Sequence, residues 1–204
     1  MSKLRIVLWI AVAAALCGLG ALSVGGFTLL SREAGRSGAS LQAGAPLGGA
    51  FQLVDAKGAP VSEAVFREKP SVTLFGYTHC PDVCPTGLTE MGNWIEALGP
   101  DADKLRFVFV TVDPERDTPD KLDQYLAFFD PSFIGLSGNP ETIQNVERDY
   151  GIFAARDEFG DSAMGYLMSH TTSYLAIDRD GKLRLVISHG TDPEIVAEDL
   201  RHLV

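Results

Sequence analysis

The chain has 204 residues, and its 27 acidic and 17 basic side chains give a formal net charge of −10 at pH 7. This length suits one domain with an appendage. Because the net charge is negative and the basic residues form no cluster, we expect no nucleic-acid partner.

The N-terminal segment has the composition of a membrane anchor. The 25 residues from 6 to 30 carry no charge, and as a helix they would span ~37 Å, more than the ~30 Å hydrocarbon core of a bilayer. Lys3 and Arg5 precede them, which predicts a cytoplasmic N-terminus and an exported remainder. We therefore expect residues 1–30 to form a retained transmembrane helix, with a cleaved signal sequence as the alternative.

Composition also divides the rest of the chain. Residues 31–49 are rich in glycine, serine and alanine, which predicts a flexible linker. The folded domain is then expected over residues 50–204, a length that can bury a hydrophobic core.

The first half of this domain predicts a hairpin followed by a strand–helix–strand unit. The hairpin begins with residues 51–54 and turns at residues 55–58. The apolar run at residues 72–75 predicts a buried strand, and residues 105–112 are typical of a central parallel strand. Between the two strands, apolar side chains recur at helical spacing at Leu88, Met91, Trp94, Ile95 and Leu98.

The second half predicts three helices and a hairpin. Thr118, Asn139 and Asp192 are each followed by proline and an acidic residue, which is typical of a helix start. Two apolar runs, residues 173–177 and 183–187, flank an Asp-Gly turn and predict the hairpin. This order of elements indicates an α/β fold whose mixed central sheet carries helices on both faces. A strand that leads into a cysteine-containing turn and helix makes the expected fold thioredoxin-like.

Cys80 and Cys84 are the only cysteines outside the N-terminal apolar segment. They lie at the expected start of a helix, where backbone N–H groups stabilise a thiolate. Two thiols this close can share one soft metal ion, or they can alternate between a dithiol and a redox disulfide. The motif alone leaves both alternatives open.

His170 is the histidine best placed to complete a metal site. It directly precedes the predicted strand at residues 171–177, where thioredoxin-like proteins usually carry a cis-proline beside the cysteine turn. This chain has no proline there, which suggests a metal ligand, with a structural histidine as an equal alternative on pattern alone. His79, next to Cys80, is expected to position the loop instead.

Three blocks of sequence resemble the SCO/SenC family of copper chaperones for cytochrome c oxidase. They are residues 76–85 (GYTHCPDVCP), residues 112–118 (VDPERDT) and residues 169–171 together with Tyr174. The blocks extend over the expected domain with the family's spacing. The resemblance implies that Cys80, Cys84 and His170 bind copper, both as Cu(I) and as Cu(II).

The resemblance also implies a role and a location. Family members carry copper to the dinuclear copper site of cytochrome c oxidase subunit II and present a thioredoxin-like domain to the periplasm or the intermembrane space. We therefore expect a metallochaperone rather than an enzyme. It would be a single-pass protein of the inner (cytoplasmic) membrane with its C-terminal domain in the periplasm. Its expected partners are subunit II and a periplasmic copper donor protein.

One position departs from the family pattern. The family often has aspartate directly before the histidine, and this chain has Ser169. A metal-bound imidazole normally donates its second N–H to a carboxylate or a carbonyl. We therefore expect a backbone carbonyl or another carboxylate to support His170, with Asp113 and Asp117 after the central strand as the candidates.

The same residues fit other functions less well. A thiol–disulfide reductase that keeps the recipient's cysteines reduced is the main alternative, but three intervening residues instead of two, and His170 in place of the cis-proline, argue against it. A peroxiredoxin-like peroxidase would need threonine and arginine around its cysteine, and no convincing set is found. Zinc would find only three visible ligands.

Overall fold

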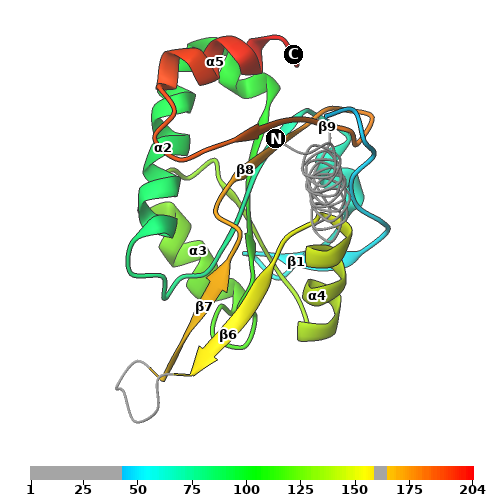
Figure 1. The fold of residues 1–204 in the computed structure, drawn as a ribbon, viewed down its shortest axis with the longest axis vertical. Helices are drawn as coiled ribbons and strands as arrows, with labels where there is room; N and C mark the ends of the chain where they lie inside the picture. The colour runs from blue at the N-terminus through cyan, green and yellow to red at the C-terminus, as the bar shows by residue number, and fades with distance from the viewer. Residues whose placement is uncertain (1–42, 159–164) are drawn as a thin grey trace, which may run out of the picture. The chain divides into compact units, whose positions relative to one another are not determined.

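The structure is a computed structural model that describes residues 43–158 and 165–204. Within these residues, seven strands form one sheet in the order β2-β1-β5-β4-β3-β8-β9, and β6 and β7 form a separate pair. The strands are β1 Gln52–Asp55, β2 Pro60–Ser62, β3 Ser71–Gly76, β4 Arg106–Thr111, β5 Ile134–Ser137, β6 Ala154–Glu158, β7 Tyr166–His170, β8 Tyr174–Ile177 and β9 Leu183–Ile187. The helices are α2 Val83–Leu98, α3 Pro119–Ala127, α4 Pro140–Asp149 and α5 Pro193–Arg201, with 3-10 turns η1 Glu63–Phe66 and η2 Gly99–Lys104 (Figure 1).

The centre of the sheet is parallel and its edges are antiparallel. β3 pairs in parallel with β4, and β5 pairs in parallel with the other side of β4. β8 and β1 join this core in antiparallel orientation. Every residue of β3 is buried, as expected of a strand covered on both faces. The predicted mixed sheet is confirmed.

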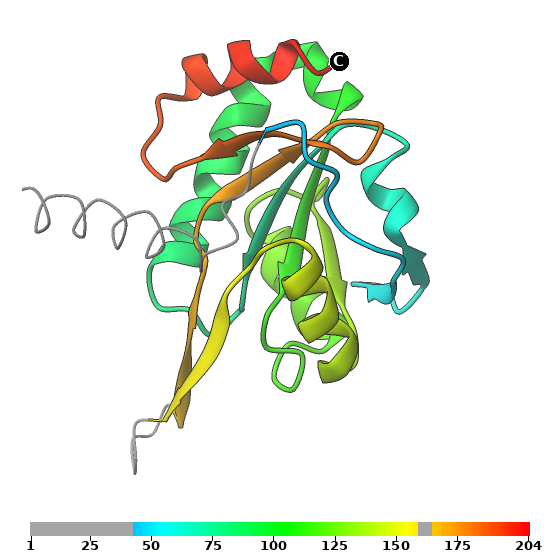
Figure 2. The ribbon, with the colours of Figure 1, turned by 45° about the vertical axis from the view of Figure 1, so that its right-hand side comes forward.

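Side chains of the central strands pack into two hydrophobic cores. On one face, Leu74 of β3 packs with Leu88 and Trp94 of α2, in a core that α3 and α5 complete. On the other face, Phe75 of β3 packs with Ile143 of α4. Figure 2 shows α4 on the opposite side of the sheet from α2 and α5. Helices therefore cover both faces, as predicted.

The later helices begin where their capping patterns predict. The Asn139 side chain accepts a hydrogen bond from the backbone N–H of Thr142 at 2.8 Å, and Asp192 accepts one from Glu194 at 2.9 Å. Thr118 precedes α3 without a side-chain cap bond. These caps satisfy N–H groups that have no partner inside the helix.

Two parts of the structure were not predicted. β5 is only four residues long, and it forms the third parallel strand between β1 and β4. β6 and β7 form an antiparallel arm of two strands that projects from the body (Figure 1). As a result, His170 ends β7 instead of directly preceding the strand at residues 171–177, because β8 begins only at Tyr174.

The packed domain also begins earlier than the predicted boundary at residue 50. The N–H of Gly44 donates to the carbonyl of Leu183 at 2.6 Å, and the N–H of Leu47 donates to the carbonyl of Gly181 at 2.9 Å. The Leu47 side chain is buried in the core. The expected transmembrane helix lies outside the described residues. Within residues 43–158 and 165–204, no helix has the length and apolar character needed to cross a bilayer.

Candidate metal centre

The cysteine loop lies between the carboxyl end of β3 and the start of α2. The N–H of Cys80 donates to the carbonyl of Tyr77 at 3.2 Å, which tightens the loop. The N–H of Cys84, in the first turn of α2, donates to the sulfur of Cys80 at 3.4 Å. The Cys80 sulfur therefore accepts one of the N–H groups that a helix start leaves without a backbone partner.

His170 approaches this loop from the end of β7. Its Nε2 atom lies 3.5 Å from the sulfur of Cys84, and its Nδ1 atom lies 2.8 Å from the carbonyl oxygen of Thr171. The ring of Tyr77 packs edge-on against the imidazole, with ring centroids 5.7 Å apart. The carbonyl and the aromatic ring together hold the imidazole so that Nε2 faces the thiols.

The ligand atoms of Cys80, Cys84 and His170 all lie within 4.8 Å of one another, and they are the only such group of metal-binding side chains among the described residues. Atoms bound to one ion at roughly 2.0–2.3 Å lie roughly 3.5–4 Å apart. A small contraction would bring this set onto a single ion. Two sulfurs and one imidazole form a soft donor set that suits copper.

The two thiols differ in burial and in acidity. Cys84 is 1% exposed and Cys80 is 9% exposed. Hydrogen bonding from Cys84, together with His170 and nearby backbone N–H groups, lowers the pKa of Cys80 to about 4 against the opposing effect of burial. The neighbouring Cys80 sulfur and burial raise the pKa of Cys84. Cys80 therefore ionises first, and a bound cation would favour loss of the second proton.

Gly76 makes room for the sulfur of Cys84. A Cβ atom at this position would lie 2.8 Å from that sulfur and 2.9 Å from a ring carbon of Phe109. Both neighbours are buried, so neither can move without disturbing the core. The glycine at the end of β3 is therefore part of the site's geometry.

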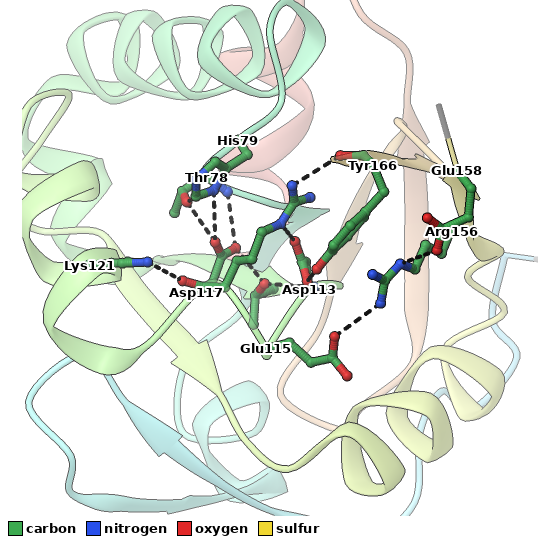
Figure 3. Close-up of polar contacts among 11 residues, drawn as sticks. Thr78, His79, Asp113, Glu115, Asp117, Lys121, Arg156, Glu158 and Tyr166 are labelled. Carbon is green, nitrogen blue, oxygen red and sulfur yellow. Dashed lines mark hydrogen bonds and ion pairs between the residues drawn. The ribbon is translucent and has the colours of Figure 1, made fainter. Parts of the chain in front are cut away.

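Asp117 holds the cysteine loop through Thr78. Its carboxylate accepts hydrogen bonds from the Thr78 N–H at 3.0 Å, the Thr78 hydroxyl at 2.6 Å and the Thr111 hydroxyl at 2.6 Å (Figure 3). Asp117 is fully buried, and burial raises its pKa while these hydrogen bonds oppose the shift. Asp117 thus links the end of β4 to the residues just before Cys80.

Asp113 belongs to a neighbouring cluster. It pairs with Arg116 and accepts a hydrogen bond from the hydroxyl of Tyr166 at 2.7 Å (Figure 3). The guanidinium groups of Arg116 and Arg156 each lie 3.6 Å from the centroid of the Tyr166 ring. Within the described residues, Asp113 and Asp117 make no hydrogen bond to His170. The partner of His170 Nδ1 is the backbone carbonyl of Thr171, which was one of the predicted kinds of support.

Three further polar side chains, those of Ser169, His79 and His189, contact groups other than the ligands. The hydroxyl of Ser169 donates to the carboxylate of Asp157 across the β6–β7 arm. His79 is half exposed, and its Nδ1 lies 3.1 Å from the Thr78 hydroxyl. His189 contacts Glu90 and the Tyr174 hydroxyl, each at 3.0 Å.

Sequence reasoning missed several supporting groups. Gly76, Tyr77 and Thr78 lie inside the cysteine motif, but the motif does not predict which atoms they contact. Thr171 contributes its backbone carbonyl, and a contact of a backbone atom cannot be predicted from a pattern of side chains. Glu147 of α4, a buried carboxylic acid, could have been found as an acid on the apolar side of an amphipathic helix.

Comparison with known proteins agrees with this geometry. The SCO1/SenC family model matches residues 39–204. The SCO2-like protein RC0895 of Rickettsia conorii is 36% identical over 156 residues, which is 76% of this chain and 76% of that protein.

Solved structures share the fold. The structure of Bradyrhizobium japonicum ScoI with copper bound is 42% identical, covers 78% of this chain and 99% of its own, and has a TM-score of 0.72. BsSco, described as a member of the Sco family of cytochrome c oxidase assembly proteins, is 19% identical and covers 79% of this chain and 95% of its own. With a TM-score of 0.63, BsSco supports the fold alone.

Proposed function

Because this chain belongs to the SCO1/SenC family, we propose that it is a copper metallochaperone. Cys80, Cys84 and His170 hold the ion, and the chain delivers it to the dinuclear copper site of cytochrome c oxidase subunit II. The observation that carries the proposal is the convergence of these three ligand atoms within 4.8 Å from two distant parts of the sequence. Copper is the cargo of this protein.

The donor set suits both oxidation states of copper. Thiolates favour Cu(I), and thiolates with an imidazole also hold Cu(II). The lone pair of His170 Nε2 is available to the ion because Nδ1 is engaged by the Thr171 carbonyl. The ion therefore has three protein ligands. A ligand of the recipient can approach the side of the ion that these three do not cover.

The site can exchange its ion because it borders a pocket. A cavity of about 430 Å³ is lined by Cys80 and His170 and by the apolar side chains of Val83, Phe153 and Met168. Phe153 is 62% exposed. Such an opening lets a recipient's ligands reach the ion and replace the chaperone's ligands one at a time.

Membrane tethering is part of the proposal. Residues 1–30 anchor the chain in the inner (cytoplasmic) membrane, a linker follows, and the copper-binding domain lies in the periplasm. The support is the uncharged run at residues 6–30 after Lys3 and Arg5. N-terminal sequencing of the membrane fraction should begin at or near Met1, whereas a start within or after the apolar run would identify a cleaved signal peptide.

The second candidate function is reduction of the recipient's disulfide. The observation in its favour is the acidic Cys80, which lines the pocket and lies beside Cys84. The Cys80 thiolate would attack the disulfide and release one recipient thiolate. Cys84 would then resolve the mixed disulfide, so the recipient gains two electrons and this chain is oxidised to a disulfide.

Equilibrium dialysis of the full chain tests the proposed ligands. The parent should bind one copper, and Cys80→Ser, Cys84→Ser and His170→Ala should each weaken Cu(II) binding. His79→Ala and Cys17→Ser are matched controls, because they remove a histidine and a cysteine outside the proposed set. A ligand variant that binds Cu(II) as well as the parent would remove that residue from the site.

A further inference from the structure

Glu147 is a buried acid whose side chain has no partner among the described residues. It lies on α4 and is 8% exposed. Within the described residues its carboxylate makes no hydrogen bond and no ion pair, although its backbone carbonyl accepts a hydrogen bond from the N–H of Ile152 at 2.7 Å. Its side chain lines a cavity of about 310 Å³ between α4 and the β6–β7 arm. Buried carboxylates are normally hydrogen-bonded or paired, so this one indicates a site for a cationic group.

The other charges around the cavity are already matched. Asp113 is paired with Arg116 and bonded to Tyr166. Glu115 lies 3.2 Å from Arg156, which also contacts Glu158 at 2.8 Å (Figure 3). Glu147 is therefore the carboxylate left to bind an incoming positive charge.

Part of the cavity wall is apolar. Val112, Ile143, Ala154 and Ala155 line it. A carboxylate in a cavity with an apolar part to its wall fits a charged head on an aliphatic stem, as in lysine and arginine. A metal ion fits poorly, because the described residues bring no other three metal-binding side chains together besides Cys80, Cys84 and His170.

The cavity lies beside the copper site. Met168 lines both the Glu147 cavity and the pocket that contains Cys80 and His170. Along β7, Met168 lies two residues from His170, and alternate residues of a strand face the same side. A protein that covers the copper site can therefore also reach the cavity.

We infer that the Glu147 cavity receives a lysine or arginine side chain of the protein that docks over the Cys80–Cys84–His170 site. This inference rests on the proposed function, since it assigns the recipient a contact beside the copper ion. The ion pair fixes the orientation of the recipient, and the negative net charge of the chain favours a basic docking face.

The test compares Glu147→Gln with Glu141→Gln in the full chain. Both variants remove one negative charge from α4, but Glu141 is exposed and does not line the cavity. Copper-loaded parent and variants are titrated with cytochrome c oxidase subunit II. Glu147→Gln should weaken binding about tenfold or more, while Glu141→Gln should stay within about twofold of the parent. Both variants should still bind one copper.

A second arm tests the cavity without a partner. Nα-acetyl-lysine methylamide should shift the amide NMR signals of Ala154 and Ala155 in the parent. The shifts should be lost in Glu147→Gln, and the uncharged norleucine analogue should not produce them. Equal shifts from both analogues, or no shifts, would overturn the cation site.

The outcomes distinguish a failure of the docking inference from a failure of the proposed function. If the parent binds subunit II and Glu147→Gln binds it equally well, the docking inference is wrong and the proposed function stands. If the parent binds neither copper nor subunit II, the proposed function fails and the docking inference fails with it. If the lysine analogue binds but subunit II affinity does not depend on Glu147, the cavity takes small amines and the inference is again wrong.

Discussion

At the residue scale, the ligand geometry depends on Gly76 having no side chain. Gly76 lies against the sulfur of Cys84, and any larger residue must displace that sulfur or the buried Phe109. The requirement is one of space, since a Cβ would enter the volume that the sulfur occupies. Not every glycine of the domain is so confined, because a Cβ at Gly92 would meet nothing within 4 Å.

Gly76→Ala should therefore weaken both folding and copper binding. We expect a loss of about 1–3 kcal/mol in the free energy of unfolding, and Cu(II) affinity about 10- to 100-fold lower, similar to the loss of a supporting contact in other metal sites. Gly92→Ala is the matched control, because nothing lies within 4 Å of its Cβ position on α2. It should stabilise the chain by up to about 1 kcal/mol and leave copper binding unchanged. Parental copper affinity in Gly76→Ala would contradict the close approach.

Glu147 should make stability depend on pH. Burial raises its pKa from the ordinary 4.5 to about 7. The folded state then holds this proton more tightly than the unfolded chain, so the free energy of unfolding falls as pH rises from about 4.5 through 7. Glu147→Gln should raise that free energy by about 1–3 kcal/mol at pH 8 and have little effect near pH 4.

Urea unfolding of the parent, Glu147→Gln and Glu141→Gln at the two pH values measures this effect. The exposed Glu141 should contribute no comparable difference. If the parent and Glu147→Gln show the same change in stability between pH 4 and pH 8, the carboxylate is not buried as described.

At the element scale, the turn between β3 and α2 brings two thiols together. The helix start directs an N–H group at the Cys80 sulfur, and the lowered pKa of Cys80, about 4, leaves it as a thiolate at neutral pH. The thiolate is the form that attacks a disulfide, so Cys80 is ready to exchange with an oxidant.

Copper-free chain should form a disulfide between Cys80 and Cys84 in oxidised glutathione. Cys17→Ser is the suitable background, since it removes the third cysteine. Mass spectrometry should show the loss of two hydrogens, and the product should not bind copper until it is reduced. A persistent glutathione adduct on Cys80 would show instead that the Cys84 sulfur cannot reach it.

Elements with strong periodicity were predictable, and elements held by tertiary contacts were not. The apolar runs of β3 and β4 and the helical spacing of α2 predicted these elements, because each buries a continuous face. β5 has four residues with Gly135 among them, and its alignment depends on pairing with β4. β6 and β7 carry polar side chains and few buried ones, so hydrophobic pattern did not reveal them.

The same limit applies to the candidate site. The cysteine motif and the unusual histidine were visible in the sequence, but the contacts of Asp113 and Asp117 depend on how the β4 loop folds. Asp117 reaches Thr78 because β4 ends beside β3. Glu147 lines a cavity that residues of α4, β6 and β7 form together. Such contacts arise from packing between distant segments and have no local sequence pattern.

At the scale of the whole molecule, the two-core sheet holds ligands from two distant segments in one place. The cysteine loop leaves one end of β3, and the β6–β7 arm returns His170 to the same end. The domain thereby offers one soft site beside an open pocket, with an acidic cavity next to it. This arrangement suits a protein that accepts an ion and releases it to a docked partner.

The central claim is that one copper ion binds to two thiolates and one imidazole. A titration of the reduced full chain with Cu(II), followed by visible absorption, tests it most directly. The account predicts a sulfur-to-copper charge-transfer band that grows to an endpoint at one Cu(II) per chain. The band should be lost in Cys80→Ser and Cys84→Ser, altered in His170→Ala and unchanged in His79→Ala. Absence of the band in the parent, or its persistence in both cysteine variants, would contradict the account.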